Sequence, residues 1–553
     1  MLTKFSIALG VATVIALLAV GAHSQNVDDH DKIVSCYIGT WGFYRQGLGK
    51  FDIDDIDTQY CTHGFYGFAD LDNITWTIYA YDPWYDLAPE DCEPFYCNYD
   101  SYRRFTALGS DKFMPLLSIG GWNAGSGKYS MMAKDPAKRK TFVDSVIPFL
   151  EKFNFKGLDL DWENPGERLG ADATVDKENF NKLVDELYQA LTPKGMILTS
   201  AMASGYKTVE TGYDVPFLSE RLAILNIMTY DYHGYWEGHN YTGVNSPIYP
   251  REEETDPEHP WYRFNQYDAI RNYIDLGAPK DKLTLGVASY GRGFVLDDET
   301  RNGLYCDTKA GIPMGPYSID DGFWGYIEIL QAQSNDTLAP NLPGATPKQW
   351  TVVVDGCYQT PYMYNGPYWI GYDNEDSIKK KVDFANMLGI GGIMMWSIDT
   401  DDFVGVNGGS AWPLLRKVNE ELINGDFFDP NVPGNPGCKT APSCADGDFD
   451  ATTPMETSPT STETTTEPWT PTQTAPEDST SSQGGLPGAC TTHNEYLPYP
   501  GDCHKYYRCV DRENDGVFEV EIFDCGDFVY DPNSTACVDP GLYGDENLCE
   551  DRL

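Results

Sequence analysis

The chain is long, strongly acidic and rich in cysteine. It has 553 residues, and its 39 basic and 84 acidic side chains give a formal net charge of −45. This charge argues against a nucleic acid and against an anionic membrane surface as partners, because both would repel the protein. A neutral polymer is compatible with it, and the length allows a large domain with additional modules.

The first 24 residues have the pattern of a secretory signal peptide. Lys4 precedes an apolar run over residues 5–22. A membrane anchor is the alternative, but the run is short for a span and no later apolar stretch approaches one. We therefore expect a secreted, extracellular protein whose 14 cysteines are paired. Four glycosylation sequons fit this compartment: Asn73, Asn240, Asn335 and Asn533.

Residues 25–437 indicate one large globular domain. Apolar runs of strand length alternate with helical patterns at 142–153, 177–191 and 376–388. Eight strands in such an alternation predict an α/β fold of the (β/α)₈ TIM barrel type. The gap at about 295–370 leaves room for an inserted subdomain. The predicted strands are 33–38, 64–69, 115–119, 157–162, 197–202, 224–230, 283–289 and 392–397.

Three carboxylates recur at every second position around the fourth strand. Asp159, Asp161 and Glu163 therefore point the same way, since strand side chains alternate between faces. A strand with its polar face in water is the alternative, but no Lys or Arg interleaves with these acids. Crowded carboxylates share protons, and one that stays protonated at neutral pH can act as a general acid.

Candidate residues gather at the strand ends where barrel enzymes carry their chemistry. Glu163, Asp231 and Trp396 each fall at the C-terminal end of a predicted strand. Three distant segments thus agree on one face of the barrel, which we take as the active-site face.

The C-terminal part of the chain changes composition twice. Residues 438–487 form a linker rich in Thr, Ser and Pro, most clearly from about 445, and such a stretch cannot bury enough apolar surface to fold. It resembles an O-glycosylated stalk. Residues 488–553 hold six cysteines, as a small module stapled by disulfides would, and the cysteines alone allow fifteen pairings.

Several motifs in residues 30–425 together resemble those of family 18 chitinases, especially secreted arthropod ones. Two further segments flank what resembles the α+β insertion of that family: Tyr290–Arg292 and Gly371–Asp373. The motifs are SIGG at 118–121, DLDWE at 159–163, MTYD at 228–231, and Trp396.

The resemblance implies endo-hydrolysis of β-1,4-linked N-acetylglucosamine in chitin, with retention of configuration by a substrate-assisted mechanism. Glu163 would protonate the glycosidic oxygen, and Asp161 would orient the acetamido group of the substrate. Asp159 would share a proton with Asp161, and Tyr230 would donate a hydrogen bond to the acetamido oxygen. No cofactor or metal is implied, and we expect a monomer that binds chitin and chito-oligosaccharides.

The resemblance also implies a substrate groove. Trp396 would form the floor below the distorted sugar, while Asp231 and Arg292 would bind polar groups near the cleavage point. Packing in the barrel core is the alternative for Tyr290 and Met228. The predicted substrate-binding residues are Trp41, Trp122, Met228, Asp231, Trp236, Tyr290, Arg292 and Trp396.

Two positions depart from the family pattern. Lys156 and Asn164 stand where relatives usually carry Asp and Tyr. Position 156 has the opposite parity to the three acids and lies toward the N-terminal end of the barrel, so we expect it to serve stability rather than chemistry. The change at Asn164 puts one groove contact in doubt, not the acid.

The resemblance suggests a first set of disulfides. Cys36–Cys61 would match the first disulfide of the family, and Cys306–Cys357 would pin the insertion. Proximity alone suggests Cys92–Cys97 and Cys438–Cys444.

The tail resembles a peritrophin-A type chitin-binding domain. The pattern of that family implies the pairs Cys490–Cys509, Cys503–Cys549 and Cys525–Cys537. Candidate sugar-stacking residues are Tyr506, Tyr507, Phe523 and Tyr530, although some of them could form the small core instead.

Two other functions remain open from the sequence. A non-hydrolytic chitin-binding lectin is one, but such relatives typically lack the catalytic Glu, which is present here as Glu163. An endo-N-acetylglucosaminidase acting on glycoproteins is the other, and the chitin-binding tail disfavours it.

Overall fold

The computed structural model describes residues 27, 30–91, 97–237, 240–334, 342, 344, 345, 350–424, 443 and 444, and the backbone of five short strands between 496 and 538. The chain divides into two compact units, Met1–Ser461 and Thr462–Leu553, which are considered one at a time. The predicted signal peptide and most of the predicted linker lie outside the described residues. No helix in the described part of the chain is long and apolar enough to cross a bilayer.

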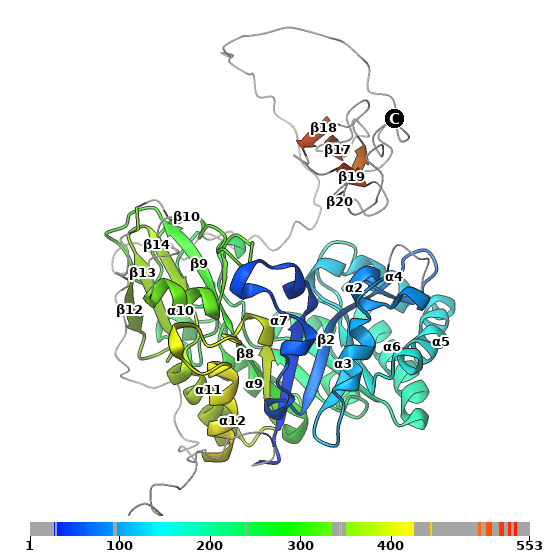
Figure 1. The fold of residues 1–553 in the computed structure, drawn as a ribbon. Helices are drawn as coiled ribbons and strands as arrows, with labels where there is room; N and C mark the ends of the chain where they lie inside the picture. The colour runs from blue at the N-terminus through cyan, green and yellow to red at the C-terminus, as the bar shows by residue number, and fades with distance from the viewer. Residues whose placement is uncertain are drawn as a thin grey trace, which may run out of the picture. The chain divides into compact units, whose positions relative to one another are not determined.

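Eight parallel strands close into a barrel in the first unit (Figure 1). Most of their residues are buried, as expected of strands covered on both faces. The short β3 (Ile78–Ala80) adds to β2 in the antiparallel sense. This architecture confirms the predicted TIM barrel. In order around the barrel, the strands are β1 (Ile33–Gly39), β2 (His63–Leu71), β4 (Met114–Gly120), β5 (Gly157–Asp161), β6 (Ile197–Ala203), β7 (Leu225–Met228), β8 (Leu283–Ala288) and β15 (Gly392–Trp396).

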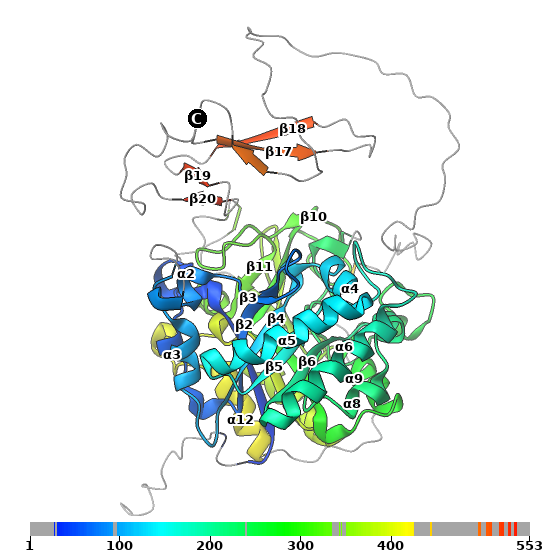
Figure 2. The same ribbon diagram turned by 90° about the vertical axis from the view of Figure 1, so that its right-hand side faces the viewer.

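Helices cover the outside of the barrel, as Figure 2 shows for α5, α6 and α9. The helix α5 illustrates how the sequence sets their ends. Asp135 caps its start, Pro136 occupies the first turn, and Asn154 ends it in the left-handed conformation. The helices are α2 (Pro83–Asp86), α3 (Ser101–Ala107), α4 (Gly127–Lys134), α5 (Pro136–Phe153), α6 (Asp176–Leu191), α7 (Tyr206–Gly212), α8 (Val215–Ser219), α9 (Gln266–Asp275), α10 (Tyr326–Ser334), α11 (Glu375–Leu388) and α12 (Pro413–Asn424).

A six-stranded antiparallel sheet and α10 form the insertion between β8 and α11. The sheet has the strand order β10-β9-β14-β13-β12, and β11 pairs with β9. It begins at Tyr290, since only Ser289 separates β8 from β9. Its strands are β9 (Tyr290–Leu296), β10 (Thr308–Gly311), β11 (Phe323–Gly325), β12 (Thr351–Val354), β13 (Pro361–Asn365) and β14 (Tyr368–Gly371).

The disulfides agree with the sequence in one place and correct it in another. Cys36 and Cys61 are bonded as predicted. Cys306 is bonded to Cys444, so the predicted pairs Cys306–Cys357 and Cys438–Cys444 are wrong. Residues 443 and 444 run beside Leu304, whose carbonyl accepts a hydrogen bond from the backbone N–H of Cys444 at 2.8 Å. The Cα atoms of Cys306 and Cys444 therefore lie 4.9 Å apart, a separation that a disulfide can bridge.

The other predicted disulfides can be compared with the structure only in part. Cys97 and Cys357 each take part in a disulfide, while Cys92 and Cys438 lie outside the described residues. Each of the three disulfides predicted for the tail also involves a residue outside the described part, so these pairs stay predictions.

The second unit contains a three-stranded antiparallel sheet and a separate hairpin. Tyr506 and Tyr507 lie on β17, where Tyr506 pairs in register with Phe523 on β18. Tyr530 lies on β19 of the hairpin. The strands are β16 (Tyr496–Pro498), β17 (Lys505–Val510), β18 (Glu519–Asp524), β19 (Val529–Asp531) and β20 (Ala536–Val538).

Candidate active site

Asp159 lies inside the barrel and is enclosed by hydroxyl groups. Its carboxylate accepts hydrogen bonds from Thr199 Oγ1 at 2.6 Å, Ser118 Oγ at 2.7 Å and Tyr37 Oη at 2.8 Å. Ser118 and Thr199 stand opposite Asp159 on the neighbouring strands β4 and β6, so the barrel register itself supplies two of the donors. Burial raises the pKa of Asp159, and the three hydroxyls oppose that shift by stabilising the carboxylate.

Asp161 and Glu163 continue the row of acids beyond Asp159. Asp161 is buried, and its Oδ1 has no hydrogen-bond partner among the described residues. Burial and the charges of Glu163 and Asp159 raise the pKa of Asp161 well above its usual value. The carboxyl of Glu163 is surrounded by protein, which raises its pKa to about 7, while Arg168 lowers it and Asp231 raises it. This group therefore holds shared protons near neutral pH.

Arg168 connects Glu163 to the exposed Trp122. Its guanidinium lies 3.7 Å from the centroid of the Trp122 ring. The same group donates hydrogen bonds to the backbone carbonyl oxygens of Trp122, at 2.8 Å, and of Glu163, at 3.1 Å. One face of the indole is thus covered by a cation, and the side chain of a loop residue fixes two predicted site residues relative to each other.

Asp231 and the insertion form the other wall of the site. Arg292 on β9 makes a two-pronged ion pair with Asp231, with distances of 2.7 Å and 2.8 Å, and the hydroxyl of Tyr290 donates to the same carboxylate at 2.8 Å. The guanidinium of Arg292 also lies 4.4 Å from the centroid of the Trp236 ring. Asp231 has a φ of 57°, a left-handed conformation that Asp tolerates better than most residues.

Aromatic side chains provide surfaces for sugar stacking. Trp41, Trp122 and Trp236 are 44%, 59% and 53% exposed, which excludes core packing for all three. Trp396 at the end of β15 is half-buried and lies 6.0 Å from Trp41, between ring centroids. Phe68 stacks on Trp396 at 5.8 Å. An apolar floor and exposed rings together suit the flat faces of pyranose rings.

Three predicted site residues also pack in the barrel core: Tyr230, Tyr290 and Met228. They belong to a cluster inside the barrel that also contains Met394, and Tyr230 and Tyr290 are almost fully buried. The hydroxyl of Tyr230 contacts the sulfur of Met394 at 3.6 Å, and burial raises its pKa well above 10.0. Tyr230 therefore stays a neutral hydrogen-bond donor at every physiological pH.

The two departures from the family pattern lie in different surroundings. Lys156 is exposed at the start of β5, and its Nζ donates to Asn154 Oδ1 at 2.7 Å. Asn164 follows Glu163 and accepts a hydrogen bond from the hydroxyl of Tyr213 at 3.3 Å. Lys156 thus lies away from the acids, as its parity predicts, while Asn164 is held beside them.

Sequence reasoning missed several residues that support the acids. Tyr37, Thr199 and Arg168 are the main ones, and Asn226 supports Tyr37 with a hydrogen bond at 3.1 Å. A signal existed for Thr199, which with Ser200 is one of two polar residues in a mostly apolar strand run. No pattern pointed to Arg168, because it lies in a loop. Within the described residues, no group of three or more His, Cys, Asp or Glu side chains could hold a metal ion.

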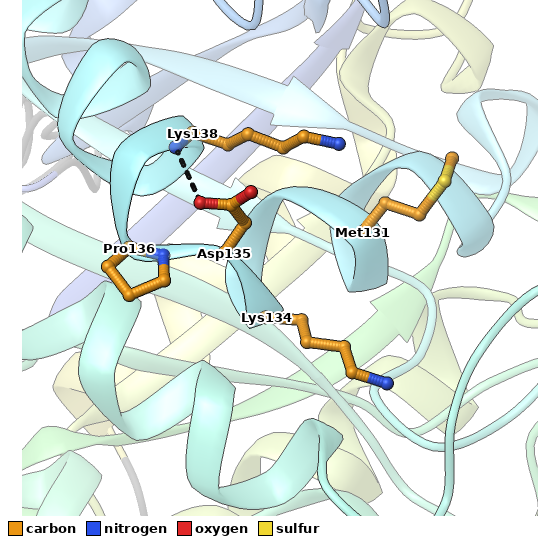
Figure 3. A pocket seen from close by; sticks show the side chains of 5 residues that line it. All are labelled: Met131, Lys134, Asp135, Pro136 and Lys138. Carbon is orange, nitrogen blue, oxygen red and sulfur yellow. Dashed lines mark hydrogen bonds between the residues drawn. The ribbon is translucent and has the colours of Figure 1, made fainter.

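A surface hollow is lined by residues of α4 and α5 and of the turn between them (Figure 3). Asp135 caps α5 there, since its carboxylate accepts hydrogen bonds from the backbone N–H groups of Ala137 and Lys138. The carboxylate in the hollow therefore serves the start of a helix, and none of the predicted site residues line the hollow. The lining residues are Met131, Lys134, Asp135, Pro136 and Lys138.

A parallel barrel with a row of acids that runs to one strand end, and with exposed tryptophans near it, is the arrangement expected of a glycoside hydrolase. The family model described as Glycosyl hydrolases family 18 matches residues 33–401. A second model, Chitin binding Peritrophin-A domain, matches residues 490–544. The chain belongs to glycosyl hydrolases family 18, which confirms the predicted family and enzyme class, and its tail has the predicted type.

Individual relatives give the same result. The chain is 36% identical over 419 residues to "Probable chitinase 2" of Drosophila melanogaster, which covers 71% of this chain and 81% of that protein. It is 34% identical over 400 residues to "Probable chitinase 10" of the same species, covering 71% of this chain but only 16% of that longer protein.

A solved structure matches the barrel unit. The Group IV chitinase of Ostrinia furnacalis in complex with allosamidin has a TM-score of 0.64 and 35% sequence identity, with 72% of this chain and 100% of that chain covered. The similarity thus extends to the fold of the whole matched domain.

Proposed function

We propose that the protein is a secreted chitinase that cuts within chains of β-1,4-linked N-acetylglucosamine. It acts without a cofactor and as a monomer. One observation carries the proposal: a carboxyl with a pKa of about 7, Glu163, follows Asp161, whose buried oxygen has no partner among the described residues. The first group suits proton donation, and the second suits a hydrogen bond from a substrate amide N–H.

In the first step, Glu163 gives its proton to the glycosidic oxygen, and the bond between that oxygen and the anomeric carbon breaks. The carbonyl oxygen of the substrate's own acetamido group forms a bond to the anomeric carbon, which leaves an oxazolinium ion. Asp161 accepts the acetamido N–H, and Tyr230 donates to the acetamido oxygen. The enzyme itself forms no covalent bond to the sugar.

In the second step, water attacks the anomeric carbon and opens the oxazolinium ion. Glu163, now a carboxylate, takes the proton of the water and returns to its starting state. Two inversions at one carbon give net retention of configuration. Asp159 supports this cycle by sharing a proton with Asp161, and hydrogen bonds from three hydroxyl groups hold its side chain in place.

The surrounding aromatic residues bind the chain on either side of the cleavage point. Trp396 lies below the reacting sugar, and Trp41, Trp122 and Trp236 stack on neighbouring sugars. Asp231 and Arg292 bind polar groups near the bond that breaks. The peritrophin-A module binds chitin separately and raises the local concentration of enzyme at the insoluble polymer.

The test is hydrolysis of a soluble N-acetylglucosamine oligomer and of colloidal chitin by the purified protein and by Glu163→Gln. Loss of the general acid should lower kcat by at least about 10²-fold while oligomer binding persists. Glu178→Gln is the matched control, because Glu178 is an exposed acid on α6. Substantial turnover by Glu163→Gln would remove the assignment, and an inactive wild type that binds chitin would support the lectin.

A further inference from the structure

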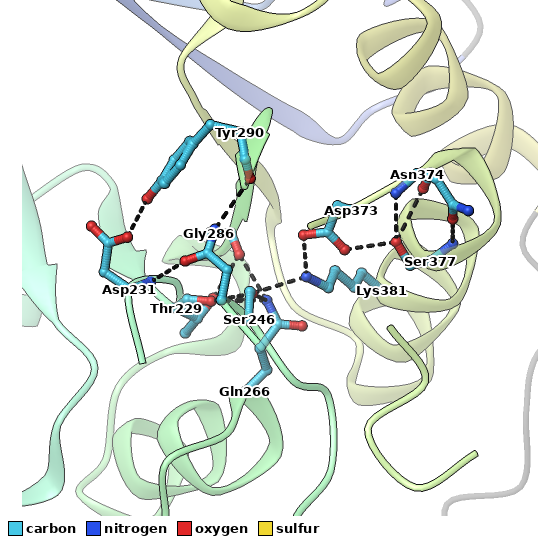
Figure 4. A network of polar contacts seen from close by, with 11 residues as sticks. Thr229, Asp231, Ser246, Gln266, Gly286, Tyr290, Asp373, Asn374, Ser377 and Lys381 are labelled. Carbon is cyan, nitrogen blue, oxygen red and sulfur yellow. Dashed lines mark hydrogen bonds and ion pairs between the residues drawn. The ribbon is translucent and has the colours of Figure 1, made fainter. Parts of the chain in front are cut away.

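A buried ion pair outside the row of acids is linked to the turn that carries Tyr230 and Asp231 (Figure 4). Lys381 on α11 is fully buried, and its Nζ lies 2.5 Å from Asp373 Oδ2. Asp373 is buried as well, and it follows β14 of the insertion. Burial lowers the pKa of Lys381, and the charge of Asp373 opposes that shift.

Ser246 links this ion pair by hydrogen bonds to the end of β7. Its Oγ accepts hydrogen bonds from Lys381 Nζ at 2.9 Å and from Gln266 Nε2 at 3.1 Å. Both of those groups can only donate, so the single hydroxyl proton of Ser246 must go elsewhere. It goes to the carbonyl oxygen of Thr229, at 2.6 Å.

The carbonyl of Thr229 belongs to the peptide group that leads into Tyr230. Gln266 Nε2 lies 3.1 Å from the same carbonyl oxygen and 2.8 Å from that of Gly286 on β8, so its two N–H groups are shared between these carbonyls and Ser246 Oγ. The next peptide N–H, that of Asp231, donates to Asn245 Oδ1 at 2.9 Å. The strand ends at Met228, so side chains rather than a strand ladder fix these peptide groups.

Stability alone is a weak reason for such a pair. A buried ion pair is often no more stabilising than apolar side chains of similar volume, because both charges lose their hydration. The charge of Lys381 can instead fix the direction in which each group of the hydrogen-bond chain donates. It leaves Ser246 one orientation, and it leaves the Thr229 carbonyl one position.

We infer that Lys381 and Asp373 are positioning residues for the hydrolysis, acting through Ser246 on the backbone that carries Tyr230. This inference rests on the proposed function. The insertion and α11 thereby help to set the distance between the Tyr230 hydroxyl and the acetamido group of the bound sugar. Misplacement of a reacting group by about 1 Å can cost about 10²-fold in rate.

The test is a double-mutant cycle on the full chain. Lys381→Met with Asp373→Asn removes both charges together, so that no unpaired charge is buried. We expect kcat for a soluble oligomer to fall by at least about tenfold, with KM changed by less than about threefold. In the background of Tyr230→Phe, the same pair of substitutions should lower kcat by less than about twofold, because both changes remove one function.

Two further variants serve as a matched control and as a substitute if the double variant does not fold. Lys379→Met is the matched control, since Lys379 lies on the same helix but forms a part-exposed pair with Glu421 at 2.8 Å; its kcat should equal that of the wild type. Ser246→Ala breaks the relay while the ion pair stays, and it replaces the double variant if that variant does not fold. A coupled loss of kcat in Ser246→Ala and Tyr230→Phe supports the inference.

The outcome is separate from that of the proposed function. Wild-type turnover in the same assay establishes the hydrolysis itself. If the wild type is active and the folded network variants keep kcat within about twofold, the inference is overturned and the hydrolysis stands. The inference is also overturned if the fold-losses of kcat from the network variants and from Tyr230→Phe simply multiply, since the two changes would then be independent.

Discussion

The pKa of Glu163 depends on a balance that one loop residue controls. Burial raises this pKa to about 7, and the positive charge of Arg168 holds it below the value it would otherwise reach. Because the first step needs Glu163 protonated, the rate should fall as the pH rises through this pKa. We therefore expect Arg168 to influence the alkaline limit of activity through the pKa of Glu163.

We expect Arg168→Gln to move the alkaline limb of the pH–kcat/KM profile to higher pH. Removal of the cation takes away a charge that favours the carboxylate, so the pKa of Glu163 rises and the protonated acid persists further. Arg168→Lys keeps the charge and is the control, with a limb close to that of the wild type. An unmoved limb in Arg168→Gln would contradict the role of its charge.

Lys156 gives a second prediction at single-residue scale. Lys156→Asp restores the family pattern but should change turnover by less than about tenfold, equivalent to roughly 1.4 kcal/mol. The reason is its place: Lys156 is exposed before β5 and hydrogen-bonds to Asn154, away from the acids. The pH–rate profiles of both forms on a soluble oligomer check it. A gain of several hundredfold would mean that Lys156 impairs the natural enzyme.

Among the secondary-structure elements, the barrel strands were the most predictable. Most are short apolar runs buried on both faces, and such runs are visible without any knowledge of contacts. The grouping of Asp159, Asp161 and Glu163 was also predictable, because every second side chain of a strand points the same way. The end of β7 was less predictable, because Thr229 N–H bonds to the Ile227 carbonyl and turns the chain before Tyr230.

Contacts across long stretches of sequence could not be predicted. The Tyr37 hydroxyl reaches Asp159 from a strand 122 residues away, and its role follows only from the closed barrel. The pair Cys306–Cys444 spans 138 residues, whereas spacing favours nearer partners. In both cases the tertiary path of the chain, not the local pattern, sets the neighbour.

The disulfide Cys306–Cys444 leads to a prediction for this part of the insertion. Replacing both cysteines with Ala should lower the free energy of unfolding of the barrel unit by about 2–4 kcal/mol, because the crosslink restricts the unfolded chain. Cleavage of a soluble oligomer by the folded variant should stay close to that of the wild type. Denaturant unfolding and a kinetic assay measure the two effects.

Peptide mapping without reduction provides the direct check. A linked peptide pair containing Cys306 and Cys444 is expected. Recovery of Cys306 linked to Cys357 would contradict the structure, and it would restore the pairing that the sequence suggested.

At the scale of the whole molecule, two units divide the work. The barrel unit contains every residue of the proposed reaction, and the tail matches a chitin-binding family over residues 490–544. The stretch between them contains few apolar residues and so cannot form a core of its own. A tethered binding module increases encounters with an insoluble polymer but changes nothing in the chemistry of a soluble one.

Truncation after Ser461, at the division between the two units, therefore separates the two activities. The cut keeps Cys444 and its bond to Cys306, so the barrel unit should stay folded. We expect kcat/KM for a soluble oligomer to remain within about twofold of the full chain, because effective concentration matters only when the substrate is a surface. Adsorption to insoluble chitin in a pull-down should weaken clearly. Full-length Glu163→Gln is the control, since it should adsorb like the wild type and so show that adsorption does not depend on turnover. Equal adsorption of the truncated and full-length proteins would mean that the groove of the barrel, rather than the tail, holds the enzyme on chitin.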